Sequence, residues 1–163
     1  MPIEVYTGPT YKEYKFMVEI NGYKAALVQS FDPGSRHHAV AERGGAGMNH
    51  PFKEAGMITF DNCILRSVCP IGGDAQLFWD AWMDQAQNPR TGNGGSTNVY
   101  MKNFTLYELD NNGDPGKATE YYQAFPIEHK PGNRDSLSKD KNVIDEIHIA
   151  YVWKEPRSIG VGV

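Results

Sequence analysis

The stretch Met57–Asn88, MITFDNCILRSVCPIGGDAQLFWDAWMDQAQN, decides the expected fold because it joins a strand to the only long helix that the sequence indicates. Ile58 and Phe60 alternate with polar neighbours, which is the period of two of a half-buried strand. A proline and a pair of glycines end this run, and Asp74 follows where its carboxylate caps the first N–H groups of a helix. Asn88 ends the helix, since the residue before a proline is steered away from the α conformation.

The expected helix has more apolar surface than a helix at a protein surface needs. At about 100° per residue, its polar side chains fall in an arc of roughly 80°. A surface helix needs an apolar stripe of about 100°, and this one has nearly twice that. Either the helix lies deep in its own domain, or its second side is covered by another subunit. The polar arc holds Gln76, Asp80, Asp84 and Gln87, and the apolar side holds Ala75, Leu77, Phe78, Trp79, Ala81, Trp82 and Ala86.

Outside this stretch, alternating apolar residues and turn residues indicate further antiparallel strands. Phe16–Ile20 precedes an Asn-Gly pair, the strongest short hairpin signal because both residues tolerate positive φ. Tyr23–Phe31 is expected to return as the partner strand. Arg36–Glu42 is a further candidate strand, and it leads into a glycine-rich loop at 43–51 with enough side chains for a contact surface. The remaining expected strands are Val99–Leu109, Ala118–His129 and Val143–Trp153.

These elements predict a mainly β (α+β) fold, an antiparallel β-barrel or sandwich with one α-helix packed on its side. At 163 residues the chain has the length of one domain and can bury about two-thirds of its unfolded surface in one core. We therefore expect a single domain over residues 1–163, with an extended N-terminal segment at 1–12 and a short C-terminal tail at 154–163.

Composition excludes several classes of function. Lys and Arg number 16 against 20 Asp and Glu, and the resulting net charge of -4 argues against general nucleic-acid binding. No apolar run approaches the roughly 20 residues needed to span a bilayer. The opening MPIEVYTGPT lacks the basic start and the apolar run of a secretory signal. We therefore expect a protein made in the cytoplasm, with Cys63 and Cys69 as reduced thiols.

One segment, DNNGDPG, has the spacing of a calcium site. Asp110, Asn112 and Asp114 match the 1-3-5 oxygen positions of a calcium-binding loop. Pro115 stands where that loop needs glycine, and Tyr121 stands where it needs a bidentate carboxylate. A hairpin turn is the better interpretation.

The other polar residues form no catalytic or metal-binding pattern. His37 and His38 are adjacent and would point to opposite faces of a strand, and no other histidine has a Cys or carboxylate at zinc-ligand spacing. The glycines at 44, 45 and 47 lack the Lys-Ser/Thr ending of a phosphate-binding loop. No Ser, Cys or Thr lies in a nucleophile motif. The sequence therefore predicts a protein that is not an enzyme, with no cofactor and no metal.

Several segments share their order and spacing with a known family. They are YKFMVEINGYKAALVQSF, VAERGGAG, GMITFDNCIL, FWDAW, VYMKNFTLYELDNNGD, YYQAFPIEHK and LSKDKNVIDEIHIAYVW. Over residues 14–153 this order resembles the tail-tube (inner tube) proteins of contractile phage tails and extracellular contractile injection systems. The tube subunit of type VI secretion systems is similar in fold, but its usual opening hairpin sequence is absent here.

The resemblance implies a structural subunit with a ring-forming tube-protein fold. Homohexameric rings would stack into a hollow tube, which sheath contraction drives through a target envelope while the lumen conducts cargo. The partners would be further copies of the chain, the sheath, baseplate and tail-terminator proteins, and a protein effector or DNA in the lumen, with no membrane anchor. The subunit would be made in the cytoplasm and assembled into a phage tail or tail-like particle, which extracellular systems release.

The resemblance also suggests contact residues. The first long loop would touch the next ring, and the apolar helix and the aromatic strand after it would supply contacts between subunits of one ring. The loop residues are Val40, Arg43, Gly44, Gly45, Gly47 and Met48, and the helix and strand residues are Trp79, Trp82, Tyr121, Tyr122 and Phe125.

A second class of function stays open beside the tube. A monomeric small-ligand-binding β-barrel would have an apolar pocket and no partner subunits, and a catalytic β-barrel ranks third. The alternatives differ in the behaviour of the isolated chain. A tube subunit forms rings or tubes, whereas a ligand-binding barrel binds an apolar probe as a monomer.

Overall fold

The computed structural model describes residues 15–20, 23–24, 28–68, 74–137 and 142–158. It confirms a mainly antiparallel β fold with few helices. The expected segment at 1–12 lies outside the described residues. In chain order the elements are β1 (Phe16–Ile20), β2 (Tyr23–Lys24), β3 (Val28–Asp32), β4 (Arg36–Arg43), β5 (Phe52–Phe60), β6 (Cys63–Val68), α1 (Asp74–Ala86), α2 (Thr97–Tyr100), β7 (Lys102–Leu109), β8 (Pro115–Lys130), β9 (Ile144–Ala150) and β10 (Trp153–Ser158).

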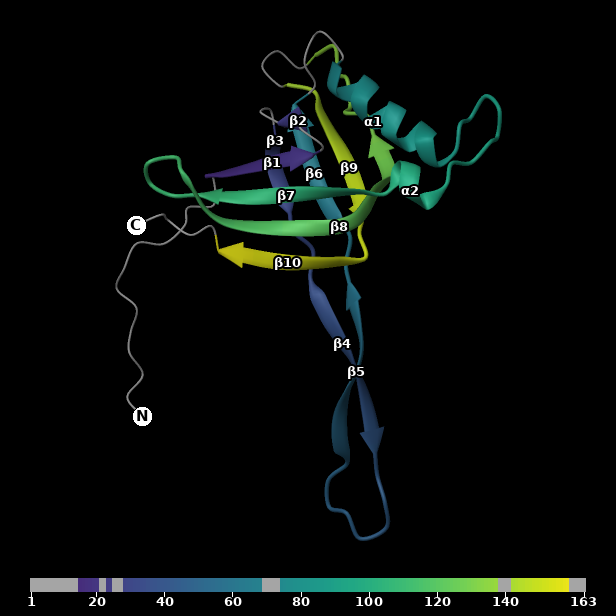
Figure 1. Cartoon of the computed structure of the whole chain (residues 1–163), viewed down its shortest axis with the longest axis vertical. Helices are drawn as coiled ribbons and strands as arrows, with labels where there is room; N and C mark the ends of the chain where they lie inside the picture. Colours follow the sequence, from purple (N-terminus) through teal and green to yellow (C-terminus); the bar gives the residue numbers. More distant parts are fainter. Residues whose placement is uncertain (1–14, 21–22, 25–27, 69–73, 138–141, 159–163) are drawn as a thin grey trace.

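The main sheet has the strand order β2-β1-β7-β8-β9-β6-β3, and β10 pairs with β8 outside this path. The long strand β8 belongs to two halves, because it pairs with β7 and β10 near its start and with β9 near its end. A bulge at Gln123, which has a φ of 54°, lies where β8 passes between the halves, and the N–H of Gln123 donates to Asn103 Oδ1. In Figure 1, β1, β7, β8 and β10 run across the view, whereas β3, β6 and β9 run steeply.

The core lies where the two halves face each other and where α1 packs on them. Phe31 on β3 meets Phe104 on β7 and Tyr121 on β8 edge to face, at ring-centroid distances of 6.2 and 6.0 Å. Such aromatic contacts across two layers join the halves into one hydrophobic core. The fully buried side chains include Val18, Ile20, Cys63, Leu65, Trp79, Trp82, Phe104, Tyr121, Ile147 and Ile149.

The helix α1 begins and ends close to the predicted residues. Its burial shows whether its wide apolar side lies in its own domain or is left for another subunit. Trp79 and Trp82 are each 1% exposed and stack at 5.9 Å, and Trp82 Nε1 donates to the carbonyl of Tyr100 at 2.6 Å. Leu77, in contrast, is 67% exposed. The tryptophans therefore serve the chain's own core, and only part of the apolar side faces outward. No helix in the described part of the chain is long and apolar enough to cross a membrane.

Several expected boundaries are wrong. Val99 and Tyr100 lie in helix α2 and not in a strand, and the expected strand Val143–Trp153 ends at Ala150, with Trp153 in β10. The expected strand Tyr23–Phe31 is divided, because β2 pairs with β1 whereas β3 pairs with β6 in the other half of the sheet. The central strand is likewise divided into β5 and β6, which belong to different sheets. The expected tail at 154–163 begins as a strand, since β10 pairs with β8 from Trp153 to Ser158. Pro156 is tolerated there because, within the described ranges, β10 pairs with β8 and has no strand on its other side.

Candidate assembly surfaces

The β4–β5 hairpin, formed by β4, β5 and the connecting residues 44–51, is a two-stranded sheet separate from the main one. Its register places Arg36 opposite Phe60 at the base and Arg43 opposite Phe52 near the tip. Figure 1 shows it extending away from the rest of the molecule. All the residues of β4 are exposed. The hairpin is therefore a projection with no layer from the described part of the same chain beneath it.

A bulge divides the hairpin into an inner and an outer half. The register shifts between His38 and Val40, so that Ala39 faces two residues of β5. Gly56 lies at this point, and a Cβ there would be 3.0 Å from the carbonyl oxygen of Ala39. Glycine therefore allows the two backbones to approach. Bulges increase the local twist, which sets the direction of the outer half.

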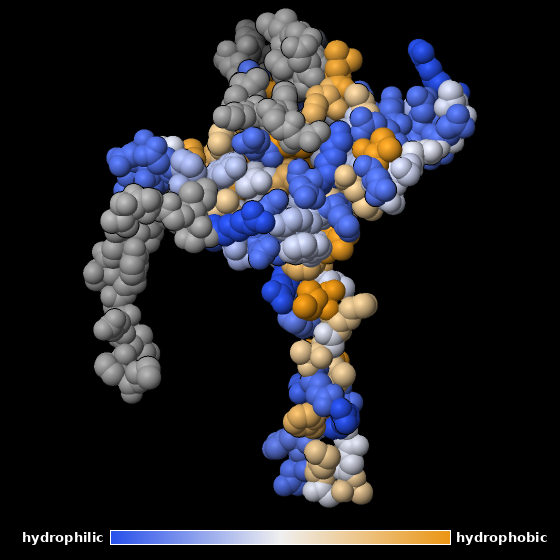
Figure 2. Space-filling model, in the orientation of Figure 1, coloured by the Kyte–Doolittle hydropathy of each residue, from blue (hydrophilic) through white to orange (hydrophobic). Residues whose placement is uncertain are grey.

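Apolar side chains occur on both faces of the hairpin. Opposed residues share a face, so Val40 and Ala55 lie on one side and Arg43 and Phe52 lie on the other. Figure 2 shows hydrophobic and hydrophilic residues interspersed along the projection. The large hydrophobic side chains exposed on the hairpin are Val40, Met48, Phe52, Met57 and Ile58, with Met57 76% and Val40 61% exposed.

Ion pairs connect the two strands of the outer half. Arg43 Nη2 donates to both carboxylate oxygens of Glu54, at 2.5 and 2.6 Å, and Lys53 lies 3.3 Å from Glu42. Exposed pairs of this kind contribute about 0–1 kcal/mol each. An isolated two-stranded hairpin is at best marginally stable in water. The hairpin therefore needs a covering surface that the described part of its own chain does not provide.

The six residues predicted for contact with the next ring all lie in the outer half. Val40 and Arg43 are on β4, and the glycines and Met48 are in the connection, where the N–H of Met48 donates to the carbonyl of Gly45 at 3.1 Å. Gly47 has a φ of 89°, which favours glycine at that position of the turn. The structure thus brings these residues together at one end of the molecule.

The residues predicted for contacts within a ring do not share one surface. Trp79, Trp82 and Tyr121 are buried in the core, so the prediction that they touch a neighbouring subunit is corrected: their side chains have no free surface. Tyr122 and Phe125 are half-buried. Tyr122 stacks on Trp153 at 3.8 Å, and Phe125 meets Tyr100 edge to face at 5.5 Å.

The surface around β10 was missed by the sequence analysis, which treated residues 154–163 as a tail. Trp153 is 41% exposed although it stacks on Tyr122, and Val152 beside it is also exposed. Arg157 on β10 pairs with Glu120 on β8 at 2.8 Å. The alternating pattern before Trp153 was visible, but the proline in β10 concealed its continuation.

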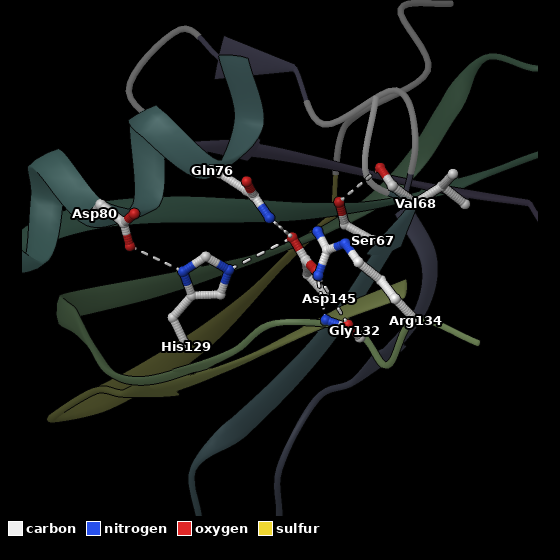
Figure 3. A network of polar contacts seen from close by, with 8 residues as sticks. All are labelled: Ser67, Val68, Gln76, Asp80, His129, Gly132, Arg134 and Asp145. Carbon is white, nitrogen blue, oxygen red and sulfur yellow. Dashed lines mark hydrogen bonds and ion pairs between the residues drawn. The ribbon is translucent and has the colours of Figure 1, made fainter. Parts of the chain in front are cut away.

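A polar network ties α1 to the sheet (Figure 3). Asp145 on β9 is buried and accepts hydrogen bonds from Gln76 Nε2 on α1 at 3.2 Å and from the N–H of Gly132 at 2.9 Å. His129 on β8 lies between two carboxylates, with Nδ1 2.9 Å from Asp80 Oδ1 and Nε2 3.5 Å from Asp145 Oδ2. Burial alone raises the pKa of Asp145, but the hydrogen bonds from Gly132 and Gln76, together with the nearby His129 ring, outweigh it and lower the pKa.

The possible calcium loop is a turn between β7 and β8. The carboxylate of Asp110 accepts hydrogen bonds from the backbone N–H groups of Asn112 and Asp114, at 2.8 and 2.9 Å. Lys15 Nζ donates to the carbonyl of Asn111 at 2.9 Å. The oxygens of this segment thus accept hydrogen bonds that stabilise the turn. Among the described residues, no group of three or more His, Cys, Asp or Glu side chains is placed to hold a metal ion.

Comparison with known proteins identifies solved structures with this fold. No protein-family model matches the chain, and no curated protein sequence matches it. Among solved structures, a chain of the PVC sheath–tube complex of an extracellular contractile injection system in the extended state is 21% identical, with a TM-score of 0.73 over 94% of this chain and 95% of that one. A chain of the PVC sheath/tube terminator in the extended state is 18% identical, with a TM-score of 0.76 over 94% and 100%. This chain has their fold.

The same fold extends to a more distant protein. Hcp1 from Flavobacterium johnsoniae is 10% identical, with a TM-score of 0.51 over 89% of this chain and 96% of that one. The resemblance seen in the sequence is therefore confirmed as a likeness in fold over nearly the whole chain. Function does not follow from fold alone.

Proposed function

We propose that this chain is a structural subunit of the inner tube of a contractile injection system or phage-like tail. Six copies form a ring, and rings stack into a hollow tube. Contraction of a surrounding sheath drives the tube through a target envelope, and the lumen conducts a protein effector or DNA. The likeness in fold to chains of a sheath–tube complex and of a sheath/tube terminator supports this class of protein.

The observation that carries the proposal is the β4–β5 hairpin. It exposes Val40, Phe52 and Met57 along a ribbon that packs on no other layer of the described chain. Hairpins of two strands need further strands or a packing surface for stability. A second copy provides that surface in an assembly that repeats along an axis. We place the contact with the next ring on Val40, Arg43, Gly44, Gly45, Gly47 and Met48.

Contacts within a ring are assigned to the margins of the main sheet and to the surface near β10. Among the residues that the structure describes, the sheet path ends at β2 and at β3, and unpaired strand margins invite pairing with another chain. Tyr122 and Phe125 remain contact candidates, and Trp153 joins them because it is large and exposed. Heterologous contacts with rotational closure give a ring without free margins.

The proposed role is structural and needs no catalysis. Partners in addition to further copies are sheath, baseplate and tail-terminator proteins. The subunit is made in the cytoplasm and assembled into a phage tail or tail-like particle, which an extracellular system releases.

The purified protein tests this proposal. Negative-stain microscopy and light scattering over a range of concentrations should show hexameric rings or stacked tubes. A chain that stays strictly monomeric at high concentration, and that does not respond to sheath or baseplate proteins, contradicts the proposal. Saturable binding of an apolar probe by that monomer would favour a ligand-binding barrel instead.

A further inference from the structure

The base of the β4–β5 hairpin is a narrow crossing of two segments. The chain leaves the main sheet after β3 through Pro33 and Gly34 and returns at Asp61, whose N–H donates to the carbonyl of Ser35 at 2.9 Å. Gly34 has a φ of 71°, and a Cβ there would lie 2.5 Å from the carbonyl oxygen of Asp61 and 2.9 Å from Tyr151 Oη. The direction of the hairpin is therefore set by a few contacts at this crossing.

Lys154 on the C-terminal strand β10 reaches this crossing. Its Nζ donates to the carbonyl of Pro33 at 3.1 Å and to the carbonyl of Gly34 at 2.8 Å, and it lies 5.7 Å from the ring centroid of Tyr121. Tyr121 Oη donates to the same carbonyl of Pro33 at 3.0 Å. One lysine thus joins the last strand of the main sheet to the segment from which the hairpin begins.

The contacts of Lys154 fix the orientation of the Pro33–Gly34 segment more than they stabilise the folded chain. Burial lowers the pKa of Lys154, because the ammonium is partly withdrawn from water. The hydrogen-bond acceptors that the structure gives it are neutral carbonyls, and the negative charge of nearby Asp32 only partly offsets the effect of burial on the pKa of Lys154. Two hydrogen bonds from one ammonium to successive carbonyls nevertheless fix the orientation of that peptide segment.

The strand that carries Lys154 is itself held in place. Trp153 stacks on Tyr122 at 3.8 Å, and Arg157 pairs with Glu120 at 2.8 Å and donates to Tyr122 Oη at 2.7 Å. These contacts lie on either side of Lys154 along β10. The ammonium therefore acts from a fixed point of the main sheet.

We infer that Lys154 is a positioning residue that sets the direction in which the β4–β5 hairpin leaves the main sheet. This inference rests on the proposed function only for its consequence in assembly. With 8 residues in β4, the strand is about 27 Å long, so a rotation of about 10° at its base moves the tip by about 5 Å. A shift of that size prevents close packing against a neighbouring copy, because complementary surfaces tolerate only about 0.5–1 Å.

Two variants of Lys154 and one control test the inference. K154M keeps an apolar stem over Tyr121 but removes the donors, whereas K154R keeps a charged donor. K117M is the control, because Lys117 lies on β8 and its ammonium is 3.7 Å from Glu108, away from the hairpin base. The direction of the hairpin is measured from residual dipolar couplings of its amides in the full-length monomer, and urea unfolding is measured in parallel.

In K154M, the hairpin couplings should no longer fit the alignment tensor of the main sheet, while the urea midpoint stays that of the wild type. The concentration for half-maximal assembly should rise by about tenfold or more in K154M and stay within about twofold in K154R and K117M. Unchanged couplings in K154M overturn the inference. If the couplings are unchanged and the urea midpoint is lowered, Lys154 has a merely structural role. If the wild type forms no rings or tubes, the proposed function fails, and the couplings still decide the role of Lys154.

Discussion

The main sheet and the β4–β5 hairpin are built from the same kinds of residues but reach stability in different ways. In the main sheet, Phe104 and Tyr121 stack at 4.4 Å and are almost fully buried. On the hairpin, Phe52 and Met57 are exposed, and no layer from the residues that the structure describes lies opposite them. The difference shows that the chain encloses one core by itself, whereas a second set of apolar side chains, on the hairpin, stays exposed; the proposed function gives these side chains to a neighbouring copy. Substitutions in the two regions should therefore change different measured quantities.

Trp82→Ala should have the largest effect on the stability of the isolated chain. The substitution removes a buried ring that stacks on Trp79 and a hydrogen bond to the carbonyl of Tyr100, so the free energy of unfolding should fall by about 3–5 kcal/mol. Urea denaturation measures this change. Met57→Ala on the hairpin is the control and should change it by less than about 0.5 kcal/mol. A Trp82→Ala protein with wild-type stability would place Trp82 outside the core.

Asp145→Asn tests the polar network that holds α1. The substitution exchanges two carboxylate acceptors for one acceptor and one donor, and should lower the free energy of unfolding by about 1–3 kcal/mol at neutral pH. Because the pKa of Asp145 is lowered in the folded state, its contribution is present above its unfolded pKa and is lost as the pH falls below about 4.

Urea titrations at several pH values distinguish this contribution from that of the other carboxylates. Wild type and Asp145→Asn should differ most at neutral pH and converge in acid. A difference that is constant down to pH 2 would show that the ionised carboxylate is not what the network stabilises. The described residues of the hairpin include no such buried polar group. Asp145→Asn should therefore change tube assembly through the hairpin less than it changes folding.

Phe52→Ser should affect assembly without affecting folding. A central aromatic contact contributes about 2 kcal/mol to an interface, so the critical concentration for tube formation should rise about 30-fold. Sedimentation of assembled from free protein measures it. Leu137→Ser removes another exposed hydrophobic side chain outside the hairpin, and should leave the critical concentration unchanged. Equal effects of the two substitutions would mean that the hairpin has no special role.

Arg43→Glu should have a small effect on folding. The Arg43–Glu54 pair is exposed, so the free energy of unfolding should change by less than about 0.5 kcal/mol. Ring stacking should nevertheless weaken, which appears as shorter tubes and a lower yield in electron micrographs. The charge-swapped protein Arg43→Glu, Glu54→Arg restores the internal pair. Recovery of tube length in that protein would indicate that Arg43 acts only within the hairpin, contrary to the proposed contact.

Local signals in the sequence predicted the elements better than their partners. The helix was expected from Asp74 to Asn88 and runs from Asp74 to Ala86, because cap and proline signals are local. The Asn-Gly signal was also correct, since Ile20 pairs with Tyr23. The change of partner after Lys24 could not be seen, because pairing of β3 with β6 depends on residues far along the chain.

Among the candidate contact residues, too, local features were predicted better than long-range partners. The glycines at 44, 45 and 47 indicated a contact loop, and the structure places them in the connection of the outer hairpin. For Trp79 and Trp82, helical periodicity gave an apolar side but not the element that covers it. The role of Lys154 gave no sequence signal at all, because its acceptors are backbone carbonyls of a segment more than 100 residues earlier.

The most direct test is to measure hydrogen–deuterium exchange of the β4–β5 hairpin amides in the free chain and in tubes formed by the same protein. If the hairpin is completed by another copy, its amides should exchange rapidly in the free chain and slowly in the tube, while the amides of β7, β8 and β9 stay protected in both. Hairpin amides that exchange equally in the two states would contradict this account.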